Sequence, residues 1–223
     1  MTRIFHAWTA FMRGSIRRAG ARMLLAAMPL IPAGALATTP VDNDDPGHIV
    51  SVLHDKLTEA MKNAAQLGYQ GRYRELEPVV TASFDTPLIV KVILSRYWDE
   101  LKDEQKTAFI GLFRRLSTAT YASRFKDYDG EQFVEVAREQ LKNERMMIRT
   151  ELRRPDESPV KLDYLLQHDE KGQWFIINVI ADGVSDLSLK RAEYAVVIKE
   201  RGFDNLVKEI EDKIKQLETD AQK

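Results

Sequence analysis

The period at which hydrophobic residues recur changes near Gly130, and this change sets the fold class of the chain. Before Gly130, apolar residues recur at spacings of three and four, which is typical of helices that bury one face. After it, segments alternate apolar and polar residues with a period of two, as strands with one buried face do. The helical spacing returns from about residue 186. This order of helices, strands and helices indicates an α+β fold with a helical N-terminal half.

Short connections rich in turn residues separate the predicted strands, for example around Pro155 and Gly172. Such connections favour antiparallel neighbours, so we expect a four-stranded antiparallel meander with the C-terminal helices packed on it. The strands are expected at residues 131–137, 145–153, 160–168 and 173–181. The helices that flank the sheet have capping signals in the sequence. We expect Asp85, Asp103, Asp204 and either Ser185 or Asp186 to begin helices, and Gly202 to end one.

Residues 1–37 have the character of a signal peptide. Their basic start carries all five of the arginines that precede Asp42, and no acidic residue lies there. An apolar run then ends in Ala35-Leu36-Ala37, which predicts a secretory signal cleaved after Ala37 and a periplasmic protein. An uncleaved membrane anchor is the alternative, although Pro29 and Pro32 interrupt the run, and translation could start at Met12. Residues 38–47 are expected to be a flexible tail, and residues 48–223 a single domain.

Composition excludes several classes of function. The chain has 33 basic and 34 acidic residues, so loss of the basic leader leaves an acidic domain unsuited to nonspecific nucleic-acid binding. It has no cysteine, which excludes disulfides, cysteine-ligated metals and thiol nucleophiles. We expect no cofactor and no metal, and a monomer. His48 and His54 lie on different faces of a helix and are interpreted as solvated or capping residues.

No catalytic motif is present in the sequence, which argues against an enzyme. Asp182 and Asp186 flank a turn and are interpreted as turn and cap residues. Asp163 and Tyr164 are neighbours on a strand and therefore point to opposite faces. The aromatic residues on the helices and strands are either plain core or the wall of an apolar cavity, and composition alone does not separate the two.

Two stretches of the chain resemble a known family. The first comprises Arg96-Tyr97-Trp98, Leu101, Gln105, Phe109, Phe113, Leu116 and Thr120-Tyr121-Ala122-Ser123-Arg124. The second is the pattern W-x-I-x-x-V-x-x-D-G-V-S from Trp174, followed by R-x-E-Y ending at Tyr194. Together they resemble the MlaC family, the toluene-tolerance auxiliary proteins of ABC transport systems. Details such as Gly71-Arg72-Tyr73 and Lys190-Arg191 resemble the branch associated with hopanoid biosynthesis, which makes hopanoid an alternative to phospholipid as the cargo.

The resemblance implies a periplasmic carrier that encloses lipid tails in a cavity between sheet and helices and moves between membrane-bound complexes of the inner membrane, the outer membrane or both. Exposing a tail to water costs about 0.8 kcal/mol per CH₂ group, so a carrier needs an apolar enclosure. An enzyme on an NTF2-like scaffold and a non-binding accessory subunit are the alternatives. The expected cavity residues, taken from strand and helix faces, are Tyr97, Trp98, Phe109, Phe113, Tyr121, Ile148, Tyr164, Trp174, Ile176 and Val184.

Overall fold

A computed structural model describes residues 45–221, so the predicted signal peptide and most of the predicted tail lie outside the described residues. The helices are α1 (Pro46–Lys62), α2 (Ala64–Ser83), α3 (Thr86–Leu94), the 3₁₀ helix η3 (Ser95–Trp98), α4 (Asp103–Arg124), α5 (Asp186–Arg201) and α6 (Phe203–Asp220). The strands are β1 (Gln132–Leu141), β2 (Arg145–Arg153), β3 (Val160–His168), β4 (Trp174–Ala181) and β5 (Val184–Ser185). The predicted α+β order is confirmed.

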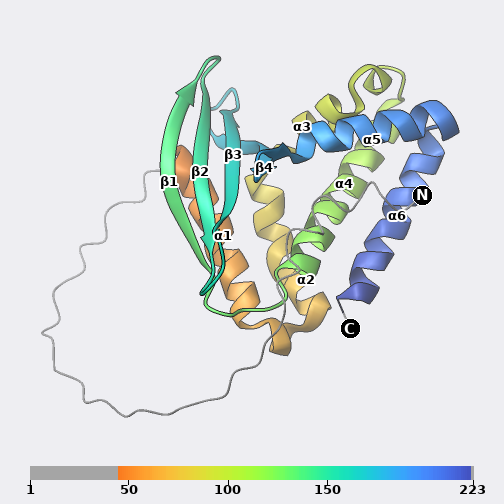
Figure 1. Ribbon diagram of the computed structural model, residues 1–223. Helices are drawn as coiled ribbons and strands as arrows, with labels where there is room; N and C mark the ends of the chain where they lie inside the picture. The colour runs from red at the N-terminus through yellow and green to blue at the C-terminus, as the bar shows by residue number, and fades with distance from the viewer. Residues whose placement is uncertain (1–44, 222–223) are drawn as a thin grey trace, which may run out of the picture. The chain divides into compact units, whose positions relative to one another are not determined.

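The strands form one antiparallel meander in the order β1-β2-β3-β4-β5 (Figure 1). The bounds predicted for β2 and β3 are confirmed. Their alternation places Ile148 opposite Tyr164 and Leu152 opposite Val160, and all four side chains are buried. The sheet has five strands and not the predicted four, because β5 adds two residues beside β4. Because buried residues alternate with more exposed ones along β2 and β3, the sheet buries one face and leaves the other more exposed.

An irregularity in β4 explains why its sequence is apolar at almost every position. The pairing of β3 with β4 shifts between Leu165 and Leu166, so that Ile177 is an additional residue in β4. On either side of it, Ile176 pairs with Leu166 and Val179 pairs with Tyr164. Ile176, Ile177 and Val179 are all buried. The continuous apolar run thus keeps the buried face apolar across the shift in register.

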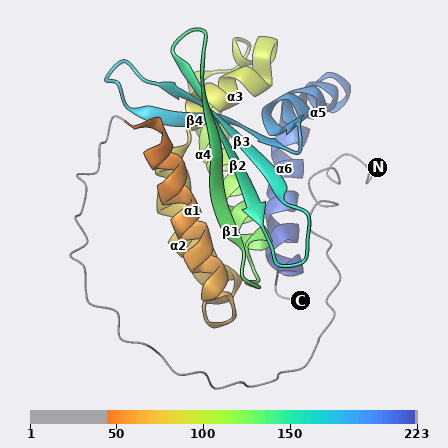
Figure 2. The same cartoon turned by 60° about the vertical axis from the view of Figure 1, so that its left-hand side comes forward.

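Helices cover the buried face of the sheet and also pack on one another. Figures 1 and 2 show α1 lying along the sheet, with α2 and α4 beside it and α5 and α6 farther along. α1 contacts β2 and β4, whereas α4 packs against α2 and α6. A second packed region, called the helical core below, lies among α3, α4, α5 and α6. Its buried members are Ile89, Val90, Ile93, Leu94, Phe109, Leu112, Phe113, Leu116, Ala119, Tyr194, Leu206, Ile210 and Leu217.

Most of the predicted helix ends agree with the structure. The Asp85 carboxylate accepts a hydrogen bond from the Leu88 amide, and Ser185 caps α5 through the Ser188 amide. Gly202 ends α5 with a φ of 85°, a conformation that favours glycine. The predictions for Asp103 and Asp204 were wrong as caps. Each lies inside the first turn of its helix, where its negative charge still suits the helix dipole.

Candidate functional site

Six rings pack together between the sheet and the helices, and we call them the inner ring cluster. They are His54, Phe84, Tyr121, Phe125, Phe133 and Tyr164. The imidazole of His54, on α1, stacks on the ring of Phe133, on β1, with centroids 4.0 Å apart. Tyr121, on α4, contacts Phe84 and Phe125 at centroid distances of 6.0 and 5.8 Å. Stacked and tilted contacts of this kind, with an edge-on contact between His54 and Tyr164, join the sheet to both α1 and α4.

One polar contact lies inside this apolar cluster. The Tyr164 hydroxyl and Nε2 of His54 share a hydrogen bond of 2.9 Å, and both residues are buried. Burial lowers the pKa of His54 from 6.5 to about 3, so its imidazole is neutral at physiological pH. Burial also raises the pKa of Tyr164 well above its usual value. Neither group has a pKa suited to acid–base catalysis near neutrality.

Four of the ten residues predicted to line the cavity meet at the inner ring cluster. Ile148 and Tyr164 are paired across β2 and β3. Tyr121 lies close enough to Tyr164 to contribute to the rise in its pKa. Ile176 forms a bridge with Phe84, whose ring contacts Tyr121. These four residues are 0–9% exposed, so the sheet-facing part of the prediction describes one continuous region.

The structure places three other predicted residues in or beside the helical core, and a fourth, Tyr97, on the neighbouring η3. Phe109 and Phe113 are members of it, and Phe109 contacts Tyr194 and Phe203. Trp98 packs on its outside, where the Lys106 ammonium lies over the indole. Tyr97 is partly exposed, and its hydroxyl accepts a hydrogen bond from Arg96. The residues predicted to line one cavity therefore lie mainly in two separate packed regions.

The last two predicted residues lie at the margins of the sheet. Trp174 begins β4 and is partly exposed, with its ring edge-on to His168. Val184 lies on β5 and is 45% exposed, which does not suit a residue inside a cavity. The lipid-sized cavity itself stays a prediction.

The interpretation of His54 as a solvated or capping residue was wrong. His54 is 7% exposed and lies on the same face of α1 as Val50 and Leu57, because the three residues are spaced by four and three. This spacing was the available signal. Phe133 was also missed, since β1 is mostly exposed and its pattern is weak.

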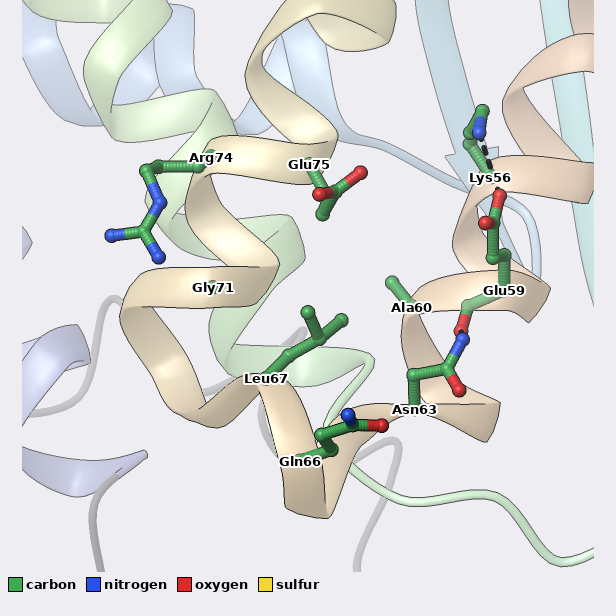
Figure 3. A pocket seen from close by; sticks show the side chains of 9 residues that line it. All are labelled: Lys56, Glu59, Ala60, Asn63, Gln66, Leu67, Gly71, Arg74 and Glu75. Carbon is green, nitrogen blue, oxygen red and sulfur yellow. Dashed lines mark hydrogen bonds and ion pairs between the residues drawn. The ribbon is translucent and has the colours of Figure 1, made fainter.

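A hollow of about 480 Å³ lies on the other side of α1, between α1 and α2 (Figure 3). Its lining is mainly polar, with Lys56 and Glu59 paired to each other and Arg74 and Glu75 on the facing helix. Exposed pairs of this kind are weak, and such a lining does not suit an acyl chain. Within residues 45–221, no cluster of side chains could hold a metal ion, and no helix is long and apolar enough to span a membrane.

Comparison with known families decides the class of this chain. The family model described as MlaC protein matches residues 52–212, which include α2 to α5 and most of α1 and α6. The chain belongs to the MlaC family. Proteins of the MlaC family are periplasmic.

A solved structure has the same fold as this MlaC family member. It is a phospholipid-binding protein from Ralstonia solanacearum, determined in complex with a phospholipid. The TM-score is 0.68 at 18% sequence identity, and the alignment covers 78% of this chain and 98% of the other. At this identity the match establishes the shared fold, including the sheet and the helices that pack on it.

Proposed function

We propose that this protein is a periplasmic phospholipid carrier that holds acyl chains between the sheet and the helices, at the inner ring cluster. The observation that carries the proposal is the continuous apolar region of Tyr121, Ile148, Tyr164 and Ile176 on a fold shared with a phospholipid-bound protein. Sites for apolar ligands are lined mainly by hydrophobic and aromatic side chains with few polar groups. The His54–Tyr164 pair satisfies the two polar groups that the rings would otherwise leave unpaired.

The proposed carrier role requires the protein to move between membrane complexes as well as to bind lipid. A periplasmic protein with enclosed acyl chains would take lipid from one membrane complex and deliver it to another without forming or breaking a covalent bond. Hopanoid is the alternative cargo. The Lys190-Arg191 pair in the sequence motivated it, and a ring-lined site would also accept a fused-ring lipid.

Native mass spectrometry of residues 38–223, secreted into the periplasm of a bacterial host, tests the proposal. The expected result is co-purified phospholipid, which a labelled phospholipid replaces after extraction. A protein that carries no lipid and takes up none contradicts the proposal. A preference for hopanoid over phospholipid in the same assay would change the cargo and leave the carrier role intact.

A matched pair of substitutions locates the acyl chains. Ile148→Phe adds volume at the sheet face, and Ile93→Phe makes the same change in the helical core, where the side chain is equally buried. Overpacking costs each variant about 1–3 kcal/mol of stability. We expect only Ile148→Phe to reduce lipid uptake, measured relative to the folded fraction. Equal losses in the two variants would contradict the location.

A further inference from the structure

The hydrogen bond between His54 and Tyr164 gives each group a partner but leaves one proton of the pair without an acceptor. A neutral imidazole carries one N–H group and a phenol carries one O–H group, so the pair has two protons to donate. The single bond of 2.9 Å between Nε2 of His54 and the Tyr164 hydroxyl uses one of them. Protonation of the imidazole would add a donor and would not remove the surplus.

The surplus donor is present in either tautomer of His54. If Tyr164 donates to Nε2, the imidazole proton lies on Nδ1, and if Nε2 donates to Tyr164, the phenol proton is left over. Among residues 45–221, neither side chain has a second hydrogen-bond partner. Buried donors rarely lack an acceptor, so the pair is expected to meet one in a ligand.

The surroundings of the pair are apolar. The neighbours of Tyr164 on the same face of β3 are Leu162 and Leu166, which are 4% and 0% exposed. Phe133 stacks on the face of the His54 imidazole, so it does not cover the ring edge from which Nδ1 and Nε2 form hydrogen bonds. His54 and Tyr164 are 7% and 2% exposed, which leaves little of the pair in contact with water.

The acceptor for this donor must be uncharged. Moving a charged group into an apolar interior without a counter-charge costs far more than one hydrogen bond returns. No charged side chain contributes to the pKa shift of His54 or Tyr164, which agrees with an uncharged environment. The uncharged acceptor that a phospholipid carries directly beside its chains is the carbonyl oxygen of each ester. An ester carbonyl therefore suits this position, and a phosphate does not.

Thr150 is a buried polar residue on the same face of the sheet that has no such surplus. It lies two residues from Ile148 on β2 and is 1% exposed. Its hydroxyl donates to the carbonyl oxygen of Leu162 at 2.6 Å, so the fold itself uses the proton. A donor left for a ligand is therefore specific to the His54–Tyr164 pair on this part of the sheet.

Resting on the proposed function, we propose that the His54–Tyr164 pair is a subsite for the ester carbonyl of one acyl chain, which accepts the surplus proton of the pair. The hydrocarbon beyond that carbonyl lies against the apolar residues of the sheet. The pair then favours lipids whose chains are joined by esters over lipids whose chains are joined by ethers, because an ether has no carbonyl oxygen.

A competition between two lipids tests this subsite. Lipid-free protein is mixed with vesicles that contain equal amounts of dipalmitoylphosphatidylcholine and its dihexadecyl ether analogue, which share the head group and the chain length. Native mass spectrometry then separates the two complexes by mass. We expect the parent protein to bind the ester lipid about fivefold more than the ether lipid, as one additional hydrogen bond predicts.

Substitutions in the pair assign the preference to its protons. Tyr164→Phe and His54→Leu remove the two donors one at a time, and the double variant removes both. The double variant should bind the two lipids equally, and the single variants show which group donates to the lipid. Thr150→Val is the matched control and should keep the preference, because the hydroxyl that it removes is already paired. Binding is expressed per folded molecule.

Equal binding of the two lipids by the parent protein, or a preference that persists in the double variant, would overturn the subsite and leave the carrier role standing. If the double variant does not fold, infrared spectroscopy of a ¹³C-labelled ester in the parent complex replaces it. A carbonyl band shifted to the lower frequency of a hydrogen-bonded ester supports the subsite, and an unshifted band overturns it. Absence of binding to both lipids would overturn the proposed function and the subsite together.

Discussion

The inner ring cluster and the helical core are both buried and rich in aromatic residues, but they differ in what else they contain. Among its buried residues, the inner ring cluster includes a hydrogen-bonded histidine and tyrosine, and it joins the sheet to α1 and α4. Apart from the Tyr194 hydroxyl, the helical core is apolar and its buried members all lie on helices, although Phe84 of the inner ring cluster also packs against it. The difference indicates that aromatic content alone does not identify a binding region, and that the location of polar groups among the rings is more informative.

The largest expected effect is a difference between the two regions in how much stability bound lipid restores to a destabilised variant. Phe125→Ala and Phe109→Ala each remove a ring that is 4% or less exposed, and each should cost about 3–5 kcal/mol of stability. Saturating phospholipid should restore more stability to Phe125→Ala, because an acyl chain can fill the space left in the inner ring cluster. Thermal unfolding with and without lipid measures this. If the alanine variants do not fold, Phe125→Leu and Phe109→Leu provide the same comparison, and equal rescue at both positions would remove the distinction.

Acid stability should depend on the inner ring cluster. His54 has a pKa of about 3 when folded and 6.5 when unfolded, so the unfolded chain binds more protons in this interval. Stability is therefore lost as pH falls from 6.5 towards 3, by on the order of 3 kcal/mol. Urea unfolding across this range should show a weaker pH dependence in His54→Gln than in the parent protein. An unchanged dependence would mean that His54 is not buried as a neutral group.

Glu193, on α5, should make stability depend on pH in the opposite direction and more weakly. The pKa of Glu193 is about 7 when folded and 4.5 when unfolded, so the folded chain binds more protons between these values. Stability from this group is present below pH 4.5 and is lost as pH rises through 7. The effect is about 1 kcal/mol or less, because Glu193 is partly exposed and solvent screens its charge. Glu193→Gln should abolish it in the same unfolding series, and a steeper loss in the variant would contradict this sign.

The fold could be predicted from the sequence wherever a period extended over several residues. The bounds of β2 and β3 followed from alternation over nine residues in each strand. β5 could not be found, because two residues carry no period. The additional residue in β4 was hidden for a related reason, since an apolar run looks the same with or without a shift in pairing.

The candidate site was harder to predict, because the apolar face of a helix does not show which other helix or strand packs on it. Phe109 and Phe113 share α4 with Tyr121, yet they pack among helices whereas Tyr121 packs near the sheet. Only the path of the chain decides between these partners. His54 was misjudged for a different reason. Its spacing from Val50 and Leu57 indicated a buried position, but histidine was interpreted as an exposed residue type.

Acyl chains are proposed to lie against the sheet and not within the helical core, and photolabelling can locate them. A phospholipid with a diazirine near the end of one chain is bound to residues 38–223, irradiated, and located by peptide mass spectrometry. We expect labels in β2, β3 and the facing residues of α1 and α4, around Ile148 and Tyr164. Labels concentrated in α3 and α6, around Ile93 and Ile210, would contradict it.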